Sequence, residues 1–155
     1  MQPDEPDAGG GRPDEVSYDA EQLLRQAAEV RTRAYVPYSS FHVGAVIVTD
    51  DGQVFEGVNV ENASYRLTCC AEQSAIATMV GAGSTGPILV VAVVGDGVDT
   101  VTPCGACRQT LLEFGPDATV HAAGADAITE SRLTATVREL LPGGFDRDRL
   151  LAEGP

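Results

Sequence analysis

The sequence predicts an α/β fold: a three-layer α/β/α sandwich that forms a single domain. The chain has 155 residues, which suits one compact domain and is too short for two of ordinary size. Strand-like and helix-like patterns alternate along it, and this order is typical of helices that pack on a shared sheet. The chain has no internal repeats, so we expect one active-site architecture.

The first residues differ in composition from the rest. Residues 1–16 are rich in Asp, Glu, Pro and Gly and have hardly any apolar side chains, so we expect a disordered acidic tail before a folded domain at 17–155. A helix should begin at Asp19, which forms a plausible capping box with Gln22, and Pro37 should end it. Its apolar residues recur at helical spacing at Leu23, Leu24, Ala27, Ala28 and Val30.

A hairpin and a second helix follow. The β-branched run from Val43 to Thr49 predicts a strand, and Asp50, Asp51 and Gly52 predict a turn into a second strand over Gln53 to Val60. The next helix should begin near Cys70 and end before two glycines, Gly81 and Gly83. We expect it to direct Ile76, Ala77 and Val80 inward.

The second half continues the alternation. The apolar run Ile88 to Gly95 predicts a strand buried on both faces. A third helix should run from Cys104 to Gly115, and Thr119 to Ala122 should form a short strand. A last capping box, Thr136 with Glu139, predicts a helix that Pro142 stops.

Charge and hydropathy limit the class of partner. The formal net charge of −13 disfavours binding to phosphate backbones and anionic membranes, so we expect neither nucleic acid nor membrane partners. No secretion signal opens the chain, and no apolar run approaches the ~20 residues of a membrane span. We therefore expect a cytoplasmic protein whose four cysteines serve metal or redox chemistry, not disulfides.

Two short segments carry the chemistry. Cys70-Ala71-Glu72 and Pro103-Cys104-Gly105-Ala106-Cys107 each lie where a helix should begin, and helix N-termini lower thiol pKa values. Three thiolates with a fourth position open to water suit a catalytic Zn²⁺ site. Glu72 follows a ligand by two residues, so its carboxylate should reach the open position as the catalytic general acid and base.

Other interpretations of the cysteines remain. A structural zinc site needs four protein ligands, and Cys69 is the one other cysteine, but adjacent residues at a helix start point in different directions. We leave Cys69 outside the metal shell. Thioredoxin-like chemistry leaves Cys70 and Glu72 unexplained.

The combination is the zinc deaminase signature, in its three-cysteine variant with a nonligand glutamate. Beyond it, the chain resembles the homotetrameric, three-cysteine zinc class of cytidine deaminases from Tyr35 to about Leu150. The resemblance implies a mixed, roughly five-stranded sheet and a homotetramer. The matching segments are Pro37 to Ser39, Phe41, Val43 to Ala45, Asn59 to Ala63, Cys70 to Glu72, Pro103 to Gln109 and Leu140 to Phe145.

The resemblance also implies roles for substrate-binding residues. Residues that match Asn59 and Glu61 hydrogen-bond the ribose hydroxyls, and an aromatic that matches Phe41 packs against the pyrimidine. The backbone of the residue that matches Ala71 contacts the amide edge of the ring. In the tetramer, positions that match Tyr65 and Phe145 help to close a neighbouring subunit's pocket.

The implied reaction converts cytidine or deoxycytidine to uridine or deoxyuridine and ammonia, in pyrimidine salvage. Hydroxide from zinc-activated water attacks C4, and Glu72 shuttles the protons. Many relatives have an arginine after the glutamate that hydrogen-bonds the zinc thiolates. This chain has Gln73 there, and we expect Gln73 and Arg108 to support the zinc thiolates from behind in place of that arginine.

Three alternatives stay open. The substrate could instead be an aminoacyl cytosine nucleoside antibiotic of the blasticidin S type, whose deaminases share the cysteine pattern; Asn59 and Glu61 favour an ordinary ribose. A nucleic-acid editor is disfavoured by the acidity of the chain and by its lack of basic or aromatic runs. A noncatalytic zinc-binding module is the alternative from a different class.

Overall fold

A mixed five-stranded sheet forms the centre of the protein. The computed structural model describes residues 16–130 and 132–152, so nearly all of the expected tail lies outside the described residues. The strand order is β2-β1-β3-β4-β5. β3 and β4 are parallel, and the other neighbouring pairs are antiparallel. The strands are β1 (Val43–Thr49), β2 (Val54–Val58), β3 (Ile88–Gly95), β4 (Thr119–Gly124) and β5 (Arg132–Thr136).

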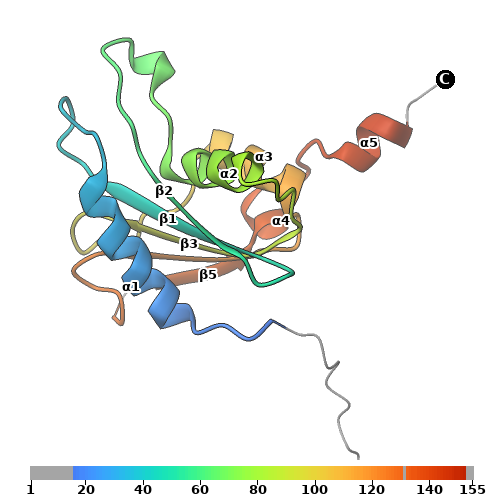
Figure 1. The fold of residues 1–155 in the computed structure, drawn as a ribbon, viewed down its shortest axis with the longest axis horizontal. Helices are drawn as coiled ribbons and strands as arrows, with labels where there is room; N and C mark the ends of the chain where they lie inside the picture. Colours follow the sequence, from blue (N-terminus) through green and yellow to red (C-terminus); the bar gives the residue numbers. More distant parts are fainter. Residues whose placement is uncertain (1–15, 131, 153–155) are drawn as a thin grey trace, which may run out of the picture.

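Helices cover both faces of the sheet. α1 (Ala20–Val30) packs on one face, mainly against β1 and β3, and α2 (Ala71–Gly81), α3 (Gly105–Phe114) and α4 (Val137–Leu140) lie on the other (Figure 1). Each interface has its own apolar core. The predicted three-layer sandwich with a mixed, five-stranded sheet is therefore confirmed.

The first helix begins as predicted and ends earlier. Asp19 is its N-cap, and its side chain accepts hydrogen bonds from Glu21 N at 2.9 Å and Gln22 N at 3.2 Å. After Val30 the chain forms one 3-10 turn, η1 (Arg31–Arg33), and becomes extended. The expectation that the helix continues to Pro37 is wrong, because Tyr35 pairs instead with the segment after β2.

The hairpin of β1 and β2 places α2. The predicted bounds of β1 are confirmed, and β2 is shorter than predicted. A Cβ added at Gly57 would lie 2.3 Å from Ala71 O and 2.2 Å from Ala75 N, so only glycine lets β2 and α2 approach this closely. The first turn of α2, where three predicted site residues lie, is thus packed against the sheet edge.

Two expectations about α2 are wrong. Ala77 and Val80 are exposed, whereas Ile76 is buried as expected. The face that packs on the sheet carries Ala71, Ala75 and Met79, which follow the helical period from a different start.

The pattern of apolar residues also left three elements without predicted positions. These are η2 (Tyr65–Leu67), β5 and α5 (Arg147–Ala152). η2 and α5 contain no buried residue, so no apolar periodicity marks them. α5 follows α4 and extends away from the sandwich (Figure 1).

Candidate metal centre and active site

Three thiols converge where α2 and α3 begin. Cys70 is the N-cap of α2, Cys104 is the N-cap of α3, and Cys107 lies in the first turn of α3. Their sulfur atoms all lie within 4.8 Å of one another, and Cys70 Sγ and Cys104 Sγ are 3.8 Å apart. The convergence predicted from the two cysteine segments is therefore present in the fold.

The spacing of the sulfurs fits a zinc ion. With Zn–S bonds of about 2.3 Å and tetrahedral angles, two sulfur ligands are about 3.8 Å apart. This matches the Cys70–Cys104 separation. In the described part of the chain, no His, Asp, Glu or further Cys joins the group. The donor set therefore fits Zn²⁺ with three protein ligands.

Two of the thiols differ in pKa. A hydrogen bond from Cys107 lowers the pKa of Cys70 to about 7. The same hydrogen bond, together with complete burial, raises the pKa of Cys107. Cys70 is also the N-cap of α2, where free amides and the helix dipole favour a thiolate. The cluster therefore contains a thiol that is ready to lose its proton near neutral pH, as metal binding requires.

Glu72 lies beside this cluster in the first turn of α2. Its side chain is 4% exposed and does not belong to the thiol group. Burial raises the pKa of its carboxyl, and a hydrogen bond with Cys107 lowers it in part. A carboxyl group with a raised pKa holds its proton more readily than an ordinary glutamate, which suits a group that accepts a proton and then returns it.

Cys69 lies outside the thiol group. Its Sγ donates to Cys70 O at 3.6 Å, and burial raises its pKa. Its backbone pairs with Val60 in both directions, at 2.9 Å each way. Cys69 therefore fixes the chain that leads into Cys70.

Arg108 and Gln73 differ in how they are held. The Arg108 guanidinium donates to Pro103 O and Leu140 O at 2.8 Å each, and to Thr102 Oγ1 at 3.3 Å. It thereby fixes the loop that presents Cys104, a role that the sequence did not indicate. Gln73 is half-buried in the first turn of α2. A direct role of either residue towards the thiolates stays a prediction.

The predicted ribose-binding residues lie on the segment after β2. Asn59 Oδ1 accepts from Val43 N at 2.8 Å, and Asn59 Nδ2 donates to Phe41 O at 2.9 Å. Glu61 Oε2 accepts from Tyr38 N at 2.9 Å and Ser39 N at 3.2 Å. Hydrogen bonding from Ser39 keeps the pKa of Glu61 below its ordinary value, and this half-buried carboxyl group has lone pairs that can accept further hydrogen bonds.

The segment with Asn59 and Glu61 is tied to the thiol cluster. On one side Tyr35 N donates to Asn59 O at 3.1 Å, and Glu61 N donates to Tyr35 O at 2.9 Å. On the other side Val60 pairs with Cys69, the residue before Cys70. These backbone bonds fix the predicted ribose-binding groups relative to a metal ligand.

The remaining predicted substrate contacts are dispersed. Phe41 is 39% exposed, and Ala71 is the first residue of α2, so its N–H has no partner within the helix. Tyr65 is 76% exposed on η2, and Phe145 is 55% exposed after α4. Tyr65 and Phe145 therefore have ample surface for contact with another subunit, and their predicted role there is not tested by the single chain.

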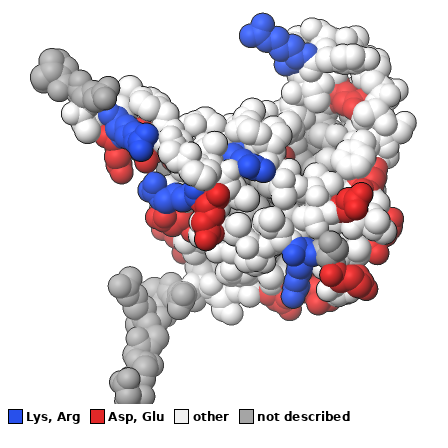
Figure 2. Space-filling model, turned by 180° about the vertical axis from the view of Figure 1, so that it is seen from behind, with Lys and Arg blue, Asp and Glu red and all other residues white. Residues whose placement is uncertain are grey.

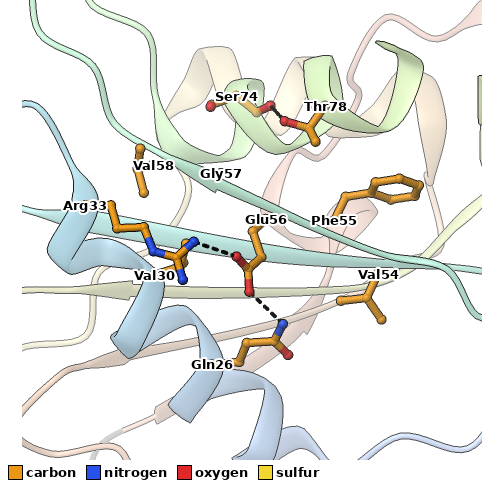
Figure 3. A pocket seen from close by; sticks show the side chains of 10 residues that line it. All are labelled: Gln26, Val30, Arg33, Val54, Phe55, Glu56, Gly57, Val58, Ser74 and Thr78. Carbon is orange, nitrogen blue, oxygen red and sulfur yellow. Dashed lines mark hydrogen bonds and ion pairs between the residues drawn. The ribbon is translucent and has the colours of Figure 1, made fainter. Parts of the chain in front are cut away.

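A separate groove lies between α1, β2 and α2. It has a volume of about 490 Å³, and Glu56 in its wall accepts hydrogen bonds from Gln26 at 2.8 Å and Arg33 at 3.3 Å (Figure 3). None of the predicted site residues lines it. The chemistry therefore belongs to the thiol cluster and not to this groove.

On the face that Figure 2 shows, basic side chains are scattered, several lie beside acidic ones, and they form no continuous stripe. None of the helices among the described residues combines the length and hydropathy that a bilayer span requires.

Known proteins resemble the chain over most of its length. The family model of the cytidine and deoxycytidylate deaminase zinc-binding region matches residues 17–123. The cytidine deaminase of Halalkalibacterium halodurans is 43% identical over 82% of this chain and 94% of its own length. The blasticidin-S deaminase of Bacillus cereus is 32% identical over 82% of this chain and 92% of its own.

Solved structures of cytidine deaminases share the fold of this chain. The crystal structure of cytidine deaminase from Burkholderia pseudomallei has a TM-score of 0.77 at 40% identity and covers 83% of this chain and all of that one. The crystal structure from Mycobacterium tuberculosis has a TM-score of 0.70 at 37% identity, with coverage of 83% and 98%. The match to the family model, over residues 17–123, includes both cysteine segments. This chain therefore belongs to the zinc-dependent cytidine and deoxycytidylate deaminase family.

Proposed function

We propose that this protein hydrolyses cytidine and deoxycytidine to uridine and deoxyuridine with release of ammonia, as a step of pyrimidine salvage. The observation that carries the proposal is the convergence of three thiols on one ion-sized space beside the buried Glu72 carboxylate. Relatives that bear the name cytidine deaminase match over nearly their whole length, which supports a nucleoside substrate.

The protein's residues divide the work as follows. Cys70, Cys104 and Cys107 would hold Zn²⁺, which when bound supplies a Lewis acid that lowers the pKa of water. Glu72 takes a proton from the attacking water and delivers it to ring N3, which makes C4 electrophilic. Water oxygen adds to C4, and Glu72 then passes a second proton to the departing amine. Water and cytidine thus become uridine and ammonia.

The substrate-binding residues orient the nucleoside for this step. The remaining lone pairs of the Glu61 carboxylate and the second lone pair and second proton of the Asn59 amide are available for ribose hydroxyls. Phe41 offers an aromatic face to the pyrimidine, and the unpartnered N–H of Ala71 can bind its amide edge. Gln73 and Arg108 would support the zinc thiolates from the outside, Arg108 through the Cys104 loop.

We also propose a cytoplasmic homotetramer in which Tyr65 and Phe145 complete a neighbouring subunit's pocket. Tyr65 and Leu67 are 76% and 66% exposed on η2, and exposed apolar groups of this kind are typical of subunit interfaces. A light-scattering mass of about four times the 16.1 kDa chain supports this assembly, and a monomeric mass excludes it.

One panel tests the substrate. Ammonia release is measured from cytidine, deoxycytidine, cytosine and blasticidin S, and bound zinc is measured on the same protein. We expect turnover of cytidine and deoxycytidine only. Turnover of blasticidin S alone would move the assignment to antibiotic deamination, and zinc binding without turnover of any substrate would indicate a noncatalytic zinc-binding module.

A further inference from the structure

A charged cluster lies behind the segment that carries Phe41. Asp96 directly follows β3, and both of its carboxylate oxygens are used: Oδ1 pairs with Arg31 NH1, and Oδ2 accepts from His42 N at 2.7 Å and His42 Nδ1 at 2.8 Å. Asp96 N also donates to His42 O at 3.1 Å. The carboxylate thus binds both the backbone and the side chain of the residue next to Phe41.

The Arg31–Asp96 pair is half-buried. The side chains of Arg31 and Asp96 are 21% and 28% exposed, and Arg31 Nε is buried without a hydrogen-bond partner. Partial burial alone would raise the pKa of Asp96, but hydrogen bonds from His42 and the charge of Arg31 lower it. Because a half-buried guanidinium needs an anion, replacing Asp96 would leave Arg31 without the partner that compensates its burial.

The side chains of Asn59 and Asp96 hold the backbone of residues 41–43 from opposite sides. The Asn59 amide binds Phe41 O and Val43 N, whereas the Asp96 carboxylate binds His42 N between them. The two side chains therefore bind successive backbone groups, which leaves the segment 41–43 little conformational freedom.

The Phe41 ring rests on the residue before Asp96. A Cβ added at Gly95 would lie 3.1 Å from Phe41 Cζ, so the ring lies over the end of β3. Asp96 therefore holds the backbone of the Phe41 segment directly beside the surface that supports its ring. A shift of His42 away from Asp96 would lift the ring from this surface.

From this arrangement we propose that Asp96, braced by Arg31, is a positioning residue that sets the Phe41 ring against the pyrimidine by holding the backbone of His42. The inference rests on the proposed deamination of cytidine. It assigns Asp96 no contact with the substrate. Losing the carboxylate should weaken binding of the nucleoside while the zinc site and Glu72 remain intact, so KM should change and kcat should not.

The test compares the full-length, zinc-loaded wild type with Asp96→Asn and a matched control, Asp117→Asn. Asp117 is also paired with an arginine, Arg138, at 2.9 Å, but it is 83% exposed. We expect Asp96→Asn to raise KM for cytidine about tenfold, the usual effect of one charged hydrogen bond, with kcat within about twofold. Asp117→Asn should leave both constants unchanged.

Two further variants show whether Asp96 acts through Phe41. The double variant Asp96→Asn with Phe41→Leu should have the same KM as Phe41→Leu alone. Once the aromatic ring has been removed, its position can no longer affect substrate binding. His42→Ala keeps the backbone bond to Asp96 and should raise KM only about threefold. It also gives a second test should Asp96→Asn fold poorly.

Several outcomes would overturn the inference. The first is an unchanged KM in Asp96→Asn. The second is a KM in the double variant that rises by the product of the two single effects. The third is a loss of both kcat and bound zinc in Asp96→Asn and in His42→Ala. Each of these presupposes a wild type that deaminates cytidine. A wild type that does not turn over cytidine refutes the proposed function itself, and the inference with it.

Discussion

A single methyl group at Gly57 should disturb the metal site from outside it. Gly57 lies on β2, and α2 crosses it with backbone atoms only: an added Cβ would meet Ala75 N at 2.2 Å and Ala71 O at 2.3 Å. The three nearest atoms are all backbone atoms, which cannot rotate away as the end of a side chain can. The substitution Gly57→Ala must therefore displace either the edge strand or the first turns of α2.

The size of the displacement follows from these distances. Ordinary contact begins at 3.4 Å, so α2 would have to move by about 1.2 Å. Overpacking of this kind typically costs about 2–3 kcal/mol, which corresponds to roughly 5–10 °C in Tm for a chain of this length. Because Cys70 and Glu72 begin the same helix, a shift of about 1 Å should also lower kcat/KM, by up to about 10²-fold.

The assay uses Gly81→Ala as the matched control. Gly81 ends the same helix, and nothing lies within 4 Å of an added Cβ, so this variant should be neutral or slightly more stable. Tm, bound zinc and kcat/KM for cytidine are measured for both variants. If Gly57→Ala matches Gly81→Ala in all three, the close approach of β2 does not set the geometry of the thiols.

Three further predictions concern single side chains. Glu72→Gln should keep zinc, measured by metal analysis, while kcat falls by about 10²–10⁴, the usual effect of lost proton transfer; loss of zinc would mean that Glu72 is a ligand. His121 is buried against Tyr18 and Thr134, and burial lowers its pKa below 6.5. The unfolded chain therefore binds the proton first, so the free energy of unfolding should fall as pH drops below 6.5, by at most about 1.4 kcal/mol per pH unit from this group. Denaturant unfolding of His121→Gln at pH 7.5 and 5.5 should show a smaller loss than the wild type, and an equal loss would exclude His121 as the source. Gln73→Arg should fold and shift zinc retention or the pH profile of kcat, because it adds a cation near three thiolates; identical metal content and profiles in the two proteins would count against this.

Sequence patterns were sufficient to predict the elements whose buried residues follow a regular pattern. β1 and β3 are nearly continuous apolar runs, and their predicted bounds are confirmed. Capping residues placed helix starts equally well: Asp19 caps α1, and Thr136 and Glu139 form the predicted capping box of α4. These signals are local, so they survive without knowledge of the fold.

Sequence patterns did not predict the elements whose position depends on contacts between distant parts of the chain. β5 alternates polar and apolar residues over only five positions at the sheet edge, and no local pattern says that it pairs with β4. The end of α1 depends on the pairing of Tyr35 with Val60, in the segment after β2. The inward face of α2 depends on Gly57, which selects Ala75 instead of Ala77 for contact.

The candidate site shows the same division. The cysteines and Glu72 were predictable because metal ligands and a proton carrier need particular residue types at particular spacings. The residues that fix their loops were not. Arg108 binds main-chain carbonyls, and Asp96 binds a main-chain N–H, so neither has a sequence signature.

X-ray absorption at the zinc edge tests the central claim most directly. On the zinc-loaded, full-length protein we expect one zinc per chain with three sulfur neighbours at about 2.3 Å and one oxygen or nitrogen neighbour. Cys69→Ser should leave this spectrum unchanged, because Cys69 lies outside the thiol group. Four sulfur neighbours, or three in the wild type and two in Cys69→Ser, would contradict an open catalytic position held by Cys70, Cys104 and Cys107.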